Sequence, residues 1–100
     1  MKGTCAVLWA LHGRIHTGSV ELVADRLQFR TRGRAVSIPL GSIAQFTIER
    51  GPAARIDGLP VLTLFLAEGD VVRLASLEGV ALLHELAAVL VPPFALRAAR

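Results

Sequence analysis

The stretch Gly18-Ser-Val-Glu-Leu-Val-Ala-Asp-Arg-Leu-Gln-Phe29 decides the fold, because it holds two short alternating runs on either side of a turn. Val20 and Leu22 share one face of the first run, and Leu27 and Phe29 share one face of the second. Apolar residues at every second position indicate a strand with one buried face. An aspartate lies between the runs, where its side chain can bond the backbone of a tight turn. The stretch therefore predicts a pair of antiparallel strands.

Further apolar runs of strand length flank this pair, and turn residues separate them. They cover Cys5 to Leu11, residues 36–40, Ile43 to Glu49, Val61 to Leu66, and Val71 to Ala75. Pro39 has no amide hydrogen to donate, which predicts that its strand ends at a sheet edge or a bulge. Phe29, Phe46 and Phe65 fall at positions that we expect to face inward. The total is about seven strands.

The hydrophobic period changes after Ser76, from the spacing of a strand to that of a helix. The apolar positions that recur at helical spacing are Val80, Leu82, Leu83, Leu86, Val89 and Leu90. Ser76 can cap the start of this helix, and Pro92-Pro93 ends it. Short twisted strands remove most of their open edges by curling. We therefore expect a mainly β protein, a small antiparallel barrel of about seven strands capped by one C-terminal helix.

The residues of the deciding stretch also resemble a known family. Gly18 to Phe29 is similar to the G-x-L-x-L-T-x-D-x-L-x-F opening of pleckstrin-homology-like domains, in particular their bacterial PH and GRAM branches. Val36-Ser-Ile-Pro-Leu-Gly-Ser-Ile43 resembles the family's I-x-L-x-x-I strand and bend. The resemblance implies one PH-like domain over residues 1–100, with a recognisable core at 18–90 and a tail at 92–100. It also implies a scaffold that binds lipids, peptides or proteins and does not catalyse.

Composition bounds the class of protein. The chain has 100 residues, which is the size of one domain, and 53% of them are hydrophobic while 19% are charged. That balance excludes intrinsic disorder. A single cysteine excludes an intramolecular disulfide. The apolar run from Cys5 to Leu11 is too short to cross a bilayer or to serve well as a signal sequence. We expect a soluble, cytoplasmic protein.

Groups that could carry out chemistry are few. The soft metal ligands are Cys5, His12, His16 and His84, and their spacing does not predict a metal site. The chain contains no nucleophile elbow and no phosphate-binding glycine loop. We therefore expect no enzyme activity and no cofactor. With one tryptophan, no tyrosine and a net charge of only +3, we also expect no nucleic-acid partner.

Two sets of residues are candidates for binding. Arg26, Arg30, Arg32 and Arg34 form a basic run without an acidic residue, and could contact an anionic lipid surface or a phosphate. Arg30 and Arg32 are expected to project together from a strand and hold a phosphate bidentately. The alternative is a solvated outer face. The mean hydropathy of +0.55 is high, which indicates a protein partner or self-association through sheet edges or terminal segments, with Trp9 and Phe94 as interface candidates.

Overall fold

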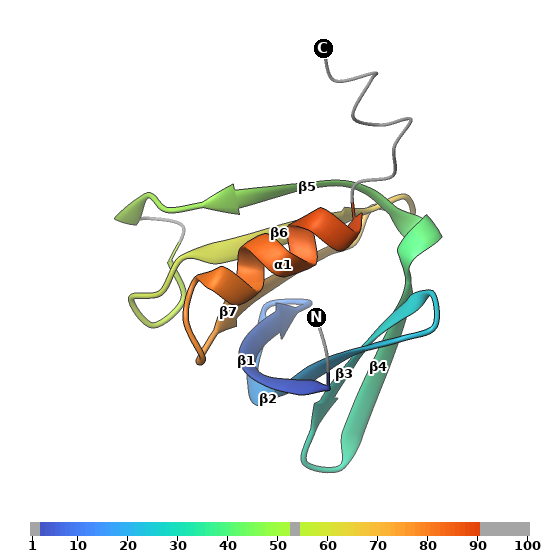
Figure 1. Ribbon diagram of the computed structural model, residues 1–100, viewed down its shortest axis with the longest axis horizontal. Helices are drawn as coiled ribbons and strands as arrows, with labels where there is room; N and C mark the ends of the chain where they lie inside the picture. Colours follow the sequence, from blue (N-terminus) through green and yellow to red (C-terminus); the bar gives the residue numbers. More distant parts are fainter. Residues whose placement is uncertain (1–2, 53–54, 91–100) are drawn as a thin grey trace.

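The computed structural model describes residues 3–52 and 55–90, which form a curled sheet of seven strands followed by one helix (Figure 1). The strands are β1 Thr4–Leu11, β2 Arg14–Val23, β3 Arg26–Thr31, β4 Arg34–Pro39, β5 Ile43–Glu49, β6 Val61–Leu66 and β7 Val71–Ser76. A short 3-10 turn, Leu40–Ser42, joins β4 to β5, and helix α1 covers Ala81–Leu90. The predicted mainly β fold with a C-terminal helix is confirmed.

The strands pair in the order β4-β3-β2-β1-β7-β6-β5, and every neighbouring pair is antiparallel. The two strands at the ends of this order, β4 and β5, follow one another in the chain. Among the described strands, none pairs with the outer side of either. The sheet is therefore a half-barrel with two open edges.

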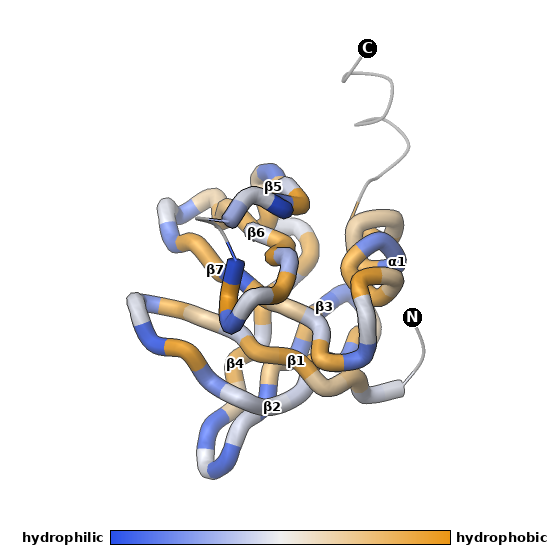
Figure 2. The backbone as a smooth tube through the Cα atoms, turned by 90° about the vertical axis from the view of Figure 1, so that its left-hand side faces the viewer, coloured by the Kyte–Doolittle hydropathy of each residue, from blue (hydrophilic) through white to orange (hydrophobic). Residues whose placement is uncertain are grey.

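The hydrophobic core fills the concave side of the sheet. Val7, Trp9, Val20, Leu27 and Phe29 lie in it and are fully or almost fully buried. Helix α1 covers this side and adds the buried leucines of its apolar face, Leu82, Leu83 and Leu86. Hydrophobic residues run along the strands and the helix, whereas hydrophilic residues gather at the hairpin turns (Figure 2). Each fully buried side chain of this size stabilises the fold by about 1.5–3 kcal/mol.

Strand β2 starts at Arg14, five residues before the predicted start of that strand at Ser19. Residues 14–18 are mostly polar, so their alternation is hidden in the sequence. A two-residue turn places them opposite β1, because His12 and Gly13 both have positive φ, 54° and 79°. Positive φ at both central residues defines the type I′ turn that joins twisted strands tightly.

Gly18 marks the point where β2 leaves β3. The pairing between these strands ends at Ser19 opposite Arg30. A Cβ atom at Gly18 would lie 1.7 Å from the carbonyl oxygen of Arg30, so no other residue fits without a backbone shift. The Thr31 hydroxyl donates to the carbonyl of Thr17 at 2.7 Å and closes the end of this contact. Glycine thus permits the close approach at which the sheet curls.

The convex side of the sheet carries a second, smaller cluster. Leu8, Ile56, Val61 and Ala75 are buried there, because the segment before β6 folds back over the strands. An isolated bridge between Ile56 and Leu59 shapes that segment. The expectation that Phe65 faces the main core is wrong, since Leu62, Leu64 and Leu66 occupy that face of β6 and Phe65 alternates with them.

Candidate interaction surfaces

The four candidate arginines all lie exposed on the β3–β4 hairpin, at three different places. Arg26 and Arg30 are on the convex face of β3, four positions apart, which corresponds to about 13 Å along the strand. Both already have side-chain partners: the Arg26 Nε donates to the Ser37 hydroxyl at 2.8 Å, and Arg30 donates to the side-chain oxygen Oε1 of Gln28 at 2.9 Å. Their position agrees with a solvated outer face.

Arg32 lies in the turn between β3 and β4, and Arg34 starts β4 opposite Thr31. The expectation that Arg30 and Arg32 project side by side from one strand is therefore wrong, because the strand ends at Thr31. On β4, Arg34 lies on the same face as the inward-facing Val36 and Ile38, whereas Ser37 lies on the opposite face. Within the described ranges, neither Arg32 nor Arg34 has a hydrogen-bond or ion-pair partner. These two are the basic side chains of the hairpin that a ligand could contact.

Trp9 belongs to the core and offers no surface to a partner. Its side chain is 1% exposed, and its ring lies 4.5 Å from the His16 ring and 5.4 Å from the Phe29 ring. It points inward because it alternates with Leu8 and Ala10, which face the convex side. The interface role expected of Trp9 is thus corrected to a core role. Phe94, the other interface candidate, lies outside the described residues.

The soft ligands are spread over the molecule. The His12 Nε2 lies 3.3 Å from a carboxylate oxygen of Asp70, and His84 contacts the Arg50 guanidinium at 2.8 Å. Cys5 is half-buried beside the core, and burial, followed by the nearby charges of Glu78 and Glu85, raises the pKa of its thiol. In the part of the chain that the structure describes, no three histidine, cysteine or acidic side chains gather at one place.

A hollow of about 310 Å³ lies on the convex face, between the β1–β2 turn and the start of β7. Its lining includes Ile15 and Val71, whose side chains are 61% and 39% exposed, and Arg73, which is half-buried. Ile15 is therefore an aliphatic side chain that water surrounds on most sides. The sequence did not predict an exposed aliphatic side chain at Ile15, because this residue lies in the polar part of β2.

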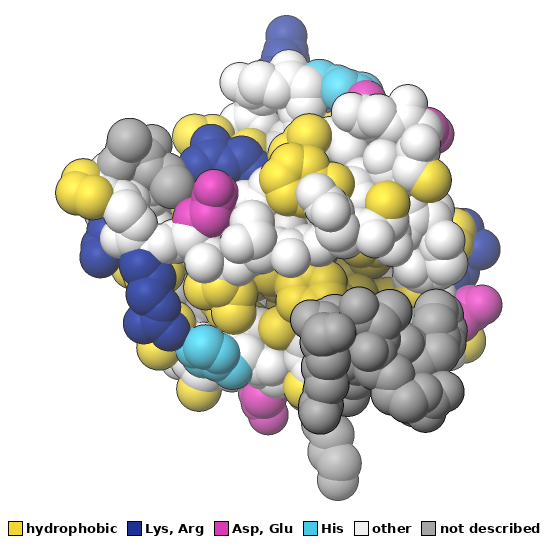
Figure 3. All heavy atoms as spheres, turned by 90° about the horizontal axis from the view of Figure 1, so that it is seen from above, with side chains coloured by type: hydrophobic (Ala, Val, Ile, Leu, Met, Phe, Trp, Pro, Cys, Tyr) yellow, Lys and Arg dark blue, Asp and Glu magenta, His cyan; other side chains and the backbone are white. Residues whose placement is uncertain are grey.

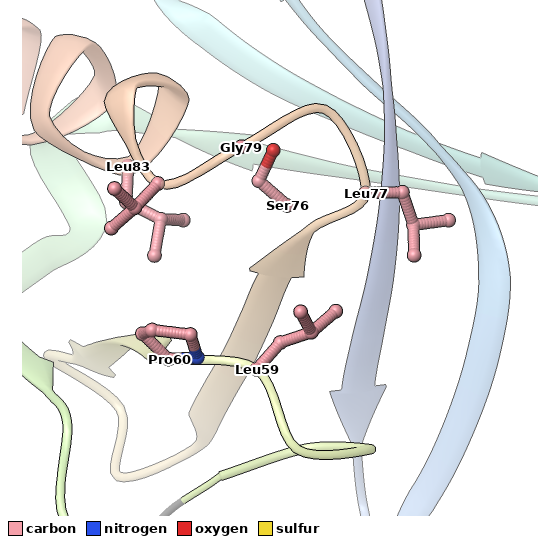
Figure 4. Close-up of a pocket in the computed structure, with 7 residues that line it drawn as sticks. Leu59, Pro60, Ser76, Leu77, Gly79 and Leu83 are labelled. Carbon is pink, nitrogen blue, oxygen red and sulfur yellow. The ribbon is translucent and has the colours of Figure 1, made fainter.

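A second hollow of about 180 Å³ lies where the chain enters α1 (Figure 4). Leu59 and Pro60, before β6, face Leu77 and Leu83 across it. Leu77 is exposed, whereas Leu83 belongs to the core. The backbone is held beside the hollow, since the Glu78 carboxylate accepts a 2.6 Å hydrogen bond from the Ala6 amide and the Ser76 hydroxyl accepts one from the Glu78 amide. Both hollows are apolar and shallow, and nothing in either points to a particular ligand.

The two open edges of the sheet differ in how they are protected. Natural sheets block an edge with charged side chains, proline or a bulge. Strand β4 carries Arg34 at its start and Pro39 at its end, which confirms the prediction that Pro39 lies at an edge. Strand β5 contains no lysine, arginine or proline; its one charged residue is Glu49, at its end, and its one irregularity lies between Ile43 and Gln45. The regular remainder, Gln45–Glu49, is defined here as the β5 edge.

The concave side of the β5 edge is apolar. Phe46 and Ile48 are half-buried and pack against the core cluster. The view from the β5 side shows a band of hydrophobic side chains across this face of the molecule (Figure 3). Gln45 and Thr47 are exposed, and Glu49 accepts a 2.8 Å hydrogen bond from the Thr63 hydroxyl of β6. Within the described residues, no strand pairs with the outer side of this edge, and its apolar side chains are only partly covered.

Comparison with models of known protein families finds no match, and no curated protein is similar enough to count as a relative. Within the described residues, no helix has the length and apolar character needed to cross a membrane. The surfaces described above therefore carry the functional argument.

Proposed function

We propose that this chain is a non-catalytic binding module of the pleckstrin-homology-like type, and that it acts through protein–protein contact, in the first place self-association. The observation that carries the proposal is the unprotected β5 edge beside the half-buried Phe46 and Ile48. A seven-stranded curled sheet followed by a helix agrees with the fold that the sequence resemblance implies.

The physical reason is that an open edge has unpaired backbone groups. Peptide N–H and C=O groups at an edge form hydrogen bonds with any extended chain that aligns with them, and side-chain contacts then give specificity. Phe46 and Ile48 would supply such contacts on one side of the edge. Binding would remove apolar surface from water without any change of fold.

Light scattering tests the proposal, with molar mass measured over a wide concentration range at low and high salt. We expect a dimer that persists at high salt, because backbone hydrogen bonds and apolar contacts are weakly screened. A monomer of 10.7 kDa at every concentration would overturn self-association.

A second candidate function rests on Arg32 and Arg34, which are exposed and have no partner among the described residues. They could contact an anionic lipid headgroup or a free phosphate, and each arginine near such a surface contributes about 1 kcal/mol. Flotation with vesicles that contain or lack phosphatidylserine tests the lipid surface. Inorganic phosphate as a competitor separates the two sources of the anion.

The matched variants for this second candidate are Arg32→Glu/Arg34→Glu and Arg26→Gln/Arg30→Gln. The first pair should abolish flotation with the anionic vesicles, whereas the second should weaken it much less because Arg26 and Arg30 already have partners. Equal recovery of the unaltered chain with both kinds of vesicle at low salt would remove this function.

A further inference from the structure

We propose that the β5 edge pairs with the β5 edge of a second copy, antiparallel, around a two-fold axis that lies midway between the two Thr47 residues. This inference rests on the proposed self-association and names both the strand and the register. The continuous sheet of the dimer would contain fourteen strands, twice the seven of one chain. A two-fold contact of this kind uses the same residues on both copies and closes on itself.

The centre of the regular segment fixes the axis. The pairing of β5 with β6 is irregular between Ile43 and Gln45 and regular from there to Glu49. Thr47 is the middle residue of this regular segment. An axis at Thr47 therefore lets all five residues pair, whereas an axis displaced along the strand leaves residues of the segment unpaired or extends into the irregularity.

The side-chain pattern supports the same axis on the concave face. In this register, Phe46 lies opposite Ile48 of the second copy, and Ile48 lies opposite Phe46. Both residues pack against the core of their own chain and are only half-buried. A pair formed by an aromatic and a β-branched residue stabilises a sheet when the two lie directly opposite each other on neighbouring strands. A register shifted by one residue would place these apolar side chains against the opposite face.

The convex face pairs polar side chains in the same register. Gln45 lies opposite Glu49 of the second copy, so its amide can donate to the carboxylate. The Thr63 hydroxyl already orients that carboxylate with a 2.8 Å hydrogen bond. The register also keeps the two Glu49 carboxylates from facing each other, and like charges directly opposite destabilise a strand pair.

The β5 edge of a second copy is a better partner for the β5 edge than the β4 edge of a second copy is. Pairing of β5 with β4 of another molecule would meet Arg34 and Pro39, and it would leave an open edge at each end of a growing chain. Pairing of β5 with itself uses up the unprotected edge and leaves the protected β4 edges outside. The expected product is therefore a closed dimer and not a growing chain of molecules.

Cysteine cross-linking tests the register. Thr47→Cys is made in a Cys5→Ser background, which removes the only native thiol. Directly opposite residues of antiparallel strands have Cα atoms about 4.5–5.5 Å apart, which suits a disulfide. The matched control is Ala35→Cys in the same background, since Ala35 is an exposed residue on the convex face of the other edge strand.

We expect mild oxidation to convert Thr47→Cys into a disulfide-linked dimer at least tenfold faster than Ala35→Cys. Circular dichroism of the reduced variants checks that both are folded. If light scattering shows a dimer but Thr47→Cys links no faster than Ala35→Cys, the β5 pairing is wrong while self-association stands. A folded protein that is monomeric at all concentrations overturns both.

Discussion

The β4 and β5 edges belong to one sheet, yet the sequence treats them differently. At the β4 edge, an arginine and a proline stand at the two ends of the strand. The β5 edge has neither, and the apolar side chains of Phe46 and Ile48 are half-buried beside it. The difference makes β5, whose one charged residue is Glu49 at its end, the edge better suited to pairing with another strand.

The largest expected effect is at Gly18, where β2 leaves β3 and the two backbones approach closely. Gly18→Ala should lower the free energy of unfolding by about 3 kcal/mol, since its Cβ would overlap the Arg30 carbonyl oxygen. Urea unfolding followed by circular dichroism measures this. The control is Gly41→Ala, because no atom lies within 4 Å of a Cβ placed there. Equal stability of the two variants would contradict the close approach.

A smaller effect is expected at Ala24, in the turn between β2 and β3. Ala24 has a φ of 55°, a left-handed conformation that costs a residue with a side chain about 1–2 kcal/mol. Ala24→Gly should therefore stabilise the fold, by about 1 kcal/mol after the entropy cost of glycine. Thermal unfolding measures the gain.

Ala35→Gly is the matched control for this substitution, since glycine within a strand is destabilising. Ala24→Gly should leave self-association unchanged, because it acts on the β4 side alone. A loss of stability in Ala24→Gly would show that the turn differs from the one described.

A positive charge placed on each edge in turn shows which edge strand forms the dimer contact. Thr47→Lys puts two lysines opposite each other at the axis, and should weaken dimerisation by about fivefold at low salt. Ala35→Lys, on the β4 edge, should leave the dimer unchanged. Sedimentation equilibrium gives both dissociation constants. If Ala35→Lys weakens the dimer and Thr47→Lys does not, the β4 edge is the contact.

The smallest effect concerns the native thiol. Burial and two nearby carboxylates raise the pKa of Cys5 above its ordinary value of 9.0, so less thiolate is present at any pH below that pKa. Alkylation of Cys5 near pH 8 should therefore be slower than that of Ala35→Cys in the Cys5→Ser background, whose thiol is on an exposed position of the β4 edge. Equal rates would contradict the half-buried position of Cys5.

Local alternation predicted the seven strands, helical spacing predicted the helix, and the missing amide hydrogen of Pro39 predicted its edge position. Three features escaped prediction for physical reasons. The start of β2 is polar and pairs through a turn, Phe65 lies on the face opposite the expected one, and Trp9 is buried where an interface was considered.

The contrast between the two edges also escaped prediction, because it depends on strand order. Residues Ile43 to Glu49 read as a strand, but nothing in their own alternation says that β5 ends the sheet. That position follows from the long-range pairing of β1 with β7, which joins the β1–β4 strands to the β5–β7 strands in one sheet.

Hydrogen–deuterium exchange of the β4 and β5 amides, at two protein concentrations that differ widely, tests the central contrast most directly. The outward amides of Gln45–Glu49 should exchange more slowly as concentration rises, because the second copy accepts their hydrogen bonds. The amides of β4 should exchange at the same rate at both concentrations. Exchange in β5 that does not depend on concentration, or slowing in β4 instead, would contradict the account.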